Sequence, residues 1–83
     1  MMRVVYISLP TVQAVQKFVE QISPMEGDMD LLSGGYVLDA RSLMGILSLD
    51  LSKPLKLAVH KETAETMKAI EPFIVPATNK NIL

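Results

Sequence analysis

The side chains that could do chemistry in this sequence are few and scattered. The chain has one histidine, His60, and no cysteine. Three aspartates, Asp28, Asp30 and Asp39, could suggest a metal site, but neither a calcium-loop pattern nor ligand-spaced histidines accompany them. We interpret these three aspartates as solvent-exposed side chains on a face of the sheet, and we interpret His60 in the same way. We find no phosphate-cradling glycine loop and no nucleophile paired with a base, so the sequence does not predict an enzyme.

Composition excludes several function classes. A length of 83 residues allows one domain, and eight basic against nine acidic side chains give a net charge of −1. Two tyrosines, two phenylalanines and no tryptophan leave few platforms for stacking bases, so no nucleic-acid partner is expected. The lack of cysteine, of a secretory signal and of a long apolar run predicts a cytoplasmic protein without a membrane span.

The N-terminal half predicts a strand, a helix and a hairpin. Residues 3–8 are rich in β-branched side chains and read as a strand. Thr11 suits a helix N-cap, and apolar residues then recur at helical spacing up to Ile22, before Pro24. Segments 28–31 and 36–39 read as two strands joined by a glycine turn.

The C-terminal half predicts two further helices around a fourth strand. Residues 42–49 read as a short helix, 55–60 as a strand and 61–71 as a helix closed by Pro72. The fold class that follows is α+β in β-α-β-β-α-β-α order, with a four-stranded antiparallel sheet and helices on one face. Residues 1–76 form the domain and 77–83 a polar tail. The core set is expected to be Val15, Phe18, Val19, Ile22, Leu31, Leu57, Val59 and Ile70.

One segment carries a resemblance to a known family. The run from Leu38 to Leu49 contains Ser42-Leu43-Met44-Gly45 and resembles the regulatory-serine segment of HPr, the histidine phosphocarrier of the sugar phosphotransferase system. The order of elements is also that of the family, which implies its two-layer open-faced sandwich. The match covers most of the chain, but only the Ser-Leu-Met-Gly helix is specific.

The chain departs from the family at the site of phosphate transfer. Counting back from Ser42 by the family spacing leads to Thr11, where the family carries its phosphate-accepting histidine. The neighbouring arginine is replaced by Gln13. The helix N-terminus could still offer backbone amides, but the nucleophile is missing. His60 could be proposed as a substitute carrier, yet the predicted strand direction puts it at the opposite end of the sheet.

The resemblance implies two roles for the Ser42 segment. Ser42 could be a regulatory phosphorylation site, and the alternative, which we favour, is a plain N-cap serine. Leu43, Met44, Ile46 and Leu47 are the expected docking residues, because a two-turn helix cannot bury all four. We expect Leu43 and Leu47 to form the exposed ridge. The alternative is that a flanking loop covers these residues.

These observations lead to one favoured function and two alternatives. The favoured function is a non-catalytic HPr-like regulatory or docking module with no cofactor and no metal. Its expected partners are phosphotransferase-system enzymes or a transcriptional regulator, and a mean hydropathy of +0.31 also allows a weak homo-oligomer. The alternatives are a phosphotransfer participant that uses another residue, and a small-ligand-binding α+β domain whose likeness to HPr is only topological.

Overall fold

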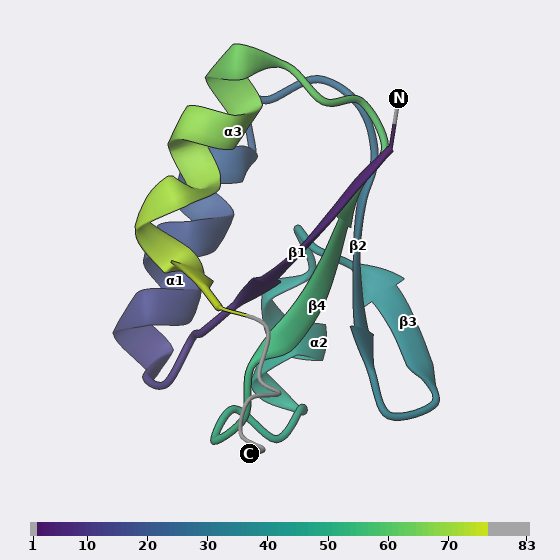
Figure 1. The fold of residues 1–83 in the computed structure, drawn as a ribbon. Helices are drawn as coiled ribbons and strands as arrows, with labels where there is room; N and C mark the ends of the chain where they lie inside the picture. Colours follow the sequence, from purple (N-terminus) through teal and green to yellow (C-terminus); the bar gives the residue numbers. More distant parts are fainter. Residues whose placement is uncertain (1, 77–83) are drawn as a thin grey trace.

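The computed structural model describes residues 2–76, which form an α+β domain with an antiparallel sheet and three α-helices (Figure 1). The strands are β1 (Arg3–Ile7), β2 (Met29–Ser33), β3 (Tyr36–Asp39), β4 (Leu55–Val59) and β5 (Ile74–Val75). The helices are α1 (Val12–Ile22), α2 (Leu43–Leu47) and α3 (Ala64–Ile70), with a short 3₁₀ turn η1 (Glu71–Phe73) before β5. The predicted tail 77–83 lies outside the described residues.

The sheet has the strand order β3-β2-β4-β1-β5, and every neighbouring pair is antiparallel. The sequence predicted four strands, and the fifth is the correction. Residues 74–75 pair with the end of β1, with Ile74 opposite Ile7 and Val75 opposite Tyr6. This strand is too short to show an alternation of its own, and only a contact distant in sequence reveals it.

Alternation along the strands separates a helix face from an open face. Ile7, Leu31 and Leu57 lie on the helix face, where they are buried together with helix residues such as Phe18 and Ile70. Val4, Val37 and Lys56 lie on the other, open face and are exposed. The predicted α+β architecture with one covered face is therefore present. Of the expected core set, only Val19 is partly exposed.

Two capping threonines define where the longer helices begin. The Thr11 hydroxyl accepts a hydrogen bond from the Ala14 N–H at 3.0 Å, and the Thr63 hydroxyl accepts one from the Thr66 N–H at 3.0 Å. The second cap sets the start of α3 at Ala64, within the predicted segment 61–71. Helices α1 and α3 pack side by side, and none of the helices in residues 2–76 is long and apolar enough to cross a membrane.

Candidate functional site

The segment between β3 and α2 is held by backbone and side-chain hydrogen bonds of Asp39 and Arg41. The Asp39 carbonyl accepts from the Ser42 N–H at 2.9 Å, and its carboxylate accepts from the Arg41 N–H at 2.8 Å. The Arg41 guanidinium donates to the Met25 carbonyl at 2.6 Å, which ties this turn to the connector after α1. These bonds fix the turn in which the chain leaves β3 and enters α2.

Helix α2 is short and lies unusually close to β3. A Cβ built at Gly45 would lie 2.9 Å from the Ser42 Oγ and 3.1 Å from Leu38 Cδ1. Glycine in the middle of a helix normally weakens it, so this close approach explains why glycine is present. At the C-terminal end, the Ser48 hydroxyl donates to the Gly45 carbonyl at 2.6 Å and ends the helix.

The four apolar residues of α2 divide differently from the prediction. Ile46 is fully buried, and Leu43 and Leu47 are partly buried against the core. Met44 is the exposed member, with 76% of its surface accessible. The expectation that Leu43 and Leu47 form an exposed ridge is wrong, because residues 43, 46 and 47 share the i, i+3, i+4 face that points into the core.

Ser42 occupies the predicted N-cap position of α2 and is exposed. Its backbone carbonyl accepts the first helical hydrogen bond from the Ile46 N–H at 2.9 Å. Its hydroxyl forms no capping hydrogen bond. The capping contribution expected of this side chain is therefore absent, and its phosphorylation stays a prediction.

The start of α1 presents a hydroxyl and an amide where the resemblance puts a histidine and an arginine. Thr11 and Gln13 are both exposed, and the Thr11 hydroxyl is engaged in the N-cap bond. Val12 between them is also half exposed. Helices α1 and α2 contact each other, so the helix that begins after Thr11 and the expected docking helix are neighbouring elements.

His60 lies at the other end of the sheet from the start of α1. It follows Val59, which pairs with Arg3 at the beginning of β1, whereas α1 follows the far end of β1. His60 Nε2 lies 2.8 Å from Asp30 Oδ2, and both side chains are partly solvent-exposed. Asp39 is directly opposite Asp30 in the β2–β3 pair. Within residues 2–76 no group of three such side chains could hold a metal ion.

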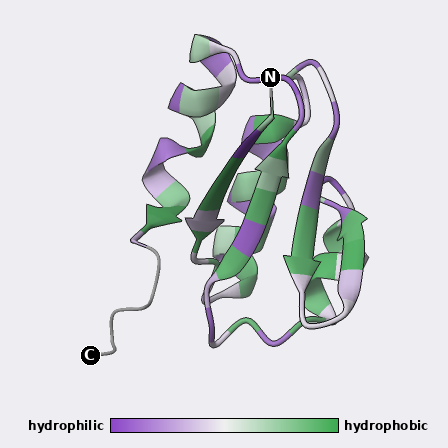
Figure 2. Cartoon of the chain, turned by 45° about the vertical axis from the view of Figure 1, so that its right-hand side comes forward, coloured by the Kyte–Doolittle hydropathy of each residue, from purple (hydrophilic) through white to green (hydrophobic). Residues whose placement is uncertain are grey.

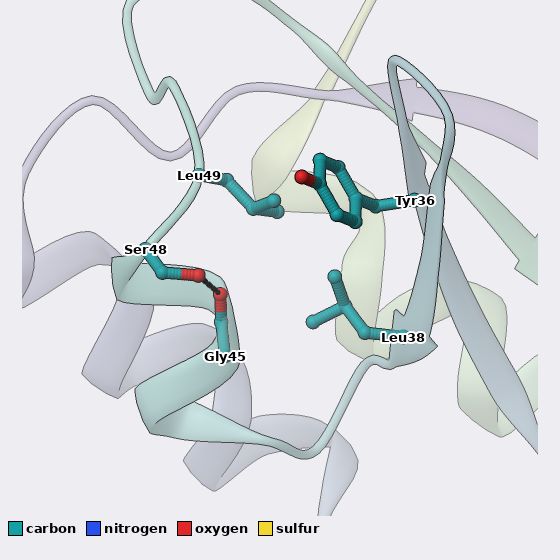
Figure 3. A pocket seen from close by; sticks show the side chains of 5 residues that line it. All are labelled: Tyr36, Leu38, Gly45, Ser48 and Leu49. Atoms are coloured by element: carbon teal, nitrogen blue, oxygen red, sulfur yellow. Dashed lines mark hydrogen bonds between the residues drawn. The ribbon is translucent and has the colours of Figure 1, made fainter.

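A hollow between β3 and α2 was not foreseen. It has a volume of about 350 Å³ and is lined by Tyr36, Leu38, Gly45, Ser48 and Leu49. Figure 3 shows the Tyr36 ring and the Leu38 side chain projecting from β3 toward Leu49 and the end of α2. The available signal was the alternation of β3, since Tyr36 and Leu38 are two residues apart and share the helix face.

Two carboxylates of this domain have pKa values below their ordinary range. A hydrogen bond and the positive charge of Lys61 lower the pKa of Glu26, and hydrogen bonds from Ser52 lower the pKa of Asp50. The Asp50 carboxylate accepts from both the hydroxyl and the N–H of Ser52 in the loop that follows α2. Both groups are on the surface, so they stabilise loops and do not indicate an active site.

Neither the protein-family models nor the curated proteins contain a match to this chain.

Proposed function

We propose that this protein is an HPr-like docking module, related to the phosphoenolpyruvate-dependent sugar phosphotransferase system and without histidine phosphocarrier activity. The Ser42-Leu43-Met44-Gly45 run and the order of the elements support the relation to HPr. An antiparallel sheet covered by helices on one face is also what that resemblance implies. The module acts by binding a protein partner in the cytoplasm.

The observation that carries the docking role is the exposure of Met44. Three apolar side chains of α2 pack toward the core, and the fourth has 76% of its surface accessible. A methionine is flexible and polarizable, so it adapts to differently shaped partner surfaces. Met44 is therefore the contact that we assign to the partner, with Leu43 and Leu47 at its margin and Ile46 as its buried support.

The absence of phosphocarrier activity is supported by the start of α1. Phosphate transfer through a carrier of this kind needs a nucleophilic imidazole nitrogen at the helix N-terminus, and Thr11 offers only a hydroxyl engaged in a capping bond. His60 is the one imidazole of the chain and lies at the opposite end of the sheet. For Ser42, an exposed hydroxyl without a capping bond is compatible with access by a kinase, as the resemblance implies.

Two assays with the first enzyme of the phosphotransferase system test this proposal. Incubation with that enzyme and labelled phosphoenolpyruvate should leave the protein unlabelled, with an HPr as the positive control. Acid-labile label that disappears in His60→Ala would instead establish phosphotransfer through another residue. Thr11→His combined with Gln13→Arg should gain label if the helix N-terminus retains the geometry of a phosphate acceptor.

The docking role is tested by titrating isotope-labelled protein with the same enzyme and with a transcriptional regulator that binds HPr. Amide shifts should concentrate on α2, and Met44→Glu should weaken binding at least about tenfold without lowering the melting temperature, because Met44 is exposed. Val4→Glu, at an exposed residue on the open face, is the matched control. Saturable binding that Met44→Glu leaves unchanged, or no binding to either protein, would contradict the proposal.

The hollow between β3 and α2 supports a second candidate function, the binding of a small, mainly apolar molecule. Its volume is at the lower end of the range for ligand sites, and leucines and a tyrosine dominate its lining. The Ser48 hydroxyl is already engaged by the Gly45 carbonyl, so the Tyr36 hydroxyl is the polar group left to orient a ligand. Amide shifts confined to this lining in a screen of small aromatic compounds would favour this function over docking.

A further inference from the structure

The two edges of the sheet are protected to very different degrees. At one edge, β5 has only two residues and is followed directly by Pro76, which cannot donate a backbone hydrogen bond. At the other edge, β3 contains neither proline nor a basic residue, and Asp39 is its single charge. Figure 2 shows β3 at the right-hand edge of the sheet, largely in the hydrophobic colour. An exposed apolar edge of this kind pairs readily with another strand.

The hairpin register shows which backbone groups of β3 are free. Ser33 and Tyr36 close a two-residue turn that begins with Gly34 at φ +61°, so they form a hydrogen-bonded pair. The pattern alternates, so Tyr36 and Leu38 bond to β2, and the N–H and C=O of Val37 point outward. The Ala40 N–H, which donates to the Met29 carbonyl at 2.9 Å, fits the same alternation.

We propose that β3 pairs with β3 of a second copy of this chain, antiparallel and with Val37 opposite Val37, to form one continuous sheet across a two-fold dimer. In a register centred on Leu38, the central N–H and C=O groups would already be bonded to β2. The register centred on Val37 uses backbone groups that point outward, so it adds hydrogen bonds between the two copies. The two Val37 residues exchange N–H···O=C bonds, and the Asp39 N–H of each copy faces the Gly35 carbonyl of the other.

Side chains and charges in this register favour a second copy as the occupant. On the helix face, Tyr36 lies opposite Leu38 of the second copy, and the same contact repeats across the two-fold axis. On the open face the two Val37 side chains meet. Tyr36 and Val37, which are 72% and 66% exposed in the single chain, thereby become covered. Asp39 lies opposite the uncharged Gly35, so no like charges face each other across the new strand pair.

The short length of β3 limits the strength of this dimer. Four residues form few hydrogen bonds, and interfaces much smaller than standard size are transient. We therefore expect a dissociation constant between about 1 µM and about 1 mM. The dimer uses a different surface from the Met44 contact, so failure of the proposed function leaves it unaffected.

Sedimentation velocity and amide exchange as a function of protein concentration test the dimer. The sedimentation coefficient should rise with concentration, and the Val37 N–H should become protected from exchange in parallel. The Leu38 N–H already bonds to β2 and serves as an internal control whose protection changes little. A chain that stays monomeric at about 1 mM would overturn the proposal.

Three variants separate edge pairing from association through the open face. Val37→Lys places a charge on the edge and should raise the dissociation constant at least about tenfold. Val37→Pro removes the central donor and should do the same, and melting curves establish whether each variant folds. Val4→Lys charges an exposed apolar residue of an inner strand and should leave dimerisation unchanged. Disruption by Val4→Lys with no effect of Val37→Lys would refute edge pairing.

Discussion

The contact between Phe18 and Phe73 offers the sharpest test of how this small domain is stabilised. Phe18 is fully buried in α1, and Phe73 ends the 3₁₀ turn that leads into β5. Their ring centroids are 5.4 Å apart and their planes meet at 82°, which is an edge-to-face contact. Such pairs contribute about 0.5–1.5 kcal/mol beyond the burial of their area. This contact therefore couples α1 to the edge strand β5.

A double-mutant cycle measures that coupling. Phe18→Ala should cost about 3–5 kcal/mol, which is comparable to the whole stability of about 4–12 kcal/mol expected for this length. Leucine is the better replacement, because it fills most of the volume and each single change should cost about 1–1.5 kcal/mol. The double variant should then lose about 0.5–1.5 kcal/mol less than the sum of the singles.

Urea denaturation followed by far-ultraviolet circular dichroism is the suitable assay, because the chain has no tryptophan. A loss of 1 kcal/mol should also lower the melting temperature by about 4–8 °C. Phe18→Leu combined with Tyr36→Leu is the matched control, because Tyr36 is exposed and distant from this contact. The reasoning fails if both single changes destabilise the protein and the coupling energy is zero within error. A second readout is the Ser8 N–H, which donates to the Phe73 carbonyl at 2.9 Å and should exchange faster in either single variant.

Two further predictions concern the contact between the connector after α1 and the segment after β4. Gly27→Ala should destabilise the domain by about 1–3 kcal/mol, because Gly27 has φ +84° and an added Cβ would lie 2.7 Å from Lys61 Cβ. Gly35→Ala, with nothing within 4 Å of an added Cβ, should cost much less, and equal urea midpoints for the two variants would contradict the clash. A hydrogen bond and the positive charge of Lys61 lower the pKa of Glu26 below its ordinary value of 4.5. The ion pair therefore stabilises the folded protein fully above pH 4.5. This stabilisation is lost as the pH falls through the lowered pKa that Glu26 has in the folded protein. Glu26→Gln should therefore reduce the loss of stability below pH 4.5, and an unchanged pH profile would count against the ion pair.

The longer elements were predictable because each contains its own apolar periodicity, capping residue or turn glycine. The apolar spacing of α1 and the N-cap at Thr11 predicted its bounds, and Val15, Phe18 and Ile22 are buried as expected. The predicted glycine turn joins β2 and β3 as an antiparallel pair, as expected. These features depend on residues close together in the sequence, which is why local patterns suffice to find them.

The elements that the sequence did not predict depend on contacts with distant residues. The pairing of Ile74 and Val75 with β1 joins the two ends of the domain, and two residues cannot display an alternation. The hollow beside Tyr36 arises where β3 and the end of α2 come together, so the alternation of β3 indicates the direction of Tyr36 and Leu38 but not the hollow itself.

The candidate docking residue shows the same limit most clearly. Residues 43–47 contain no charged or polar side chain, so the segment has no polar face that would tell which of its leucines, isoleucine or methionine point outward. The orientation is set by the close approach of Gly45 to Leu38, which turns one side of α2 toward β3 and the core. Met44 is left on the other side as an isolated apolar side chain. Because a single methionine then supplies most of the exposed apolar area of α2, a partner that binds here should lose most of its affinity when Met44 alone is changed, and little when Leu43 or Leu47 is replaced by a residue of similar size.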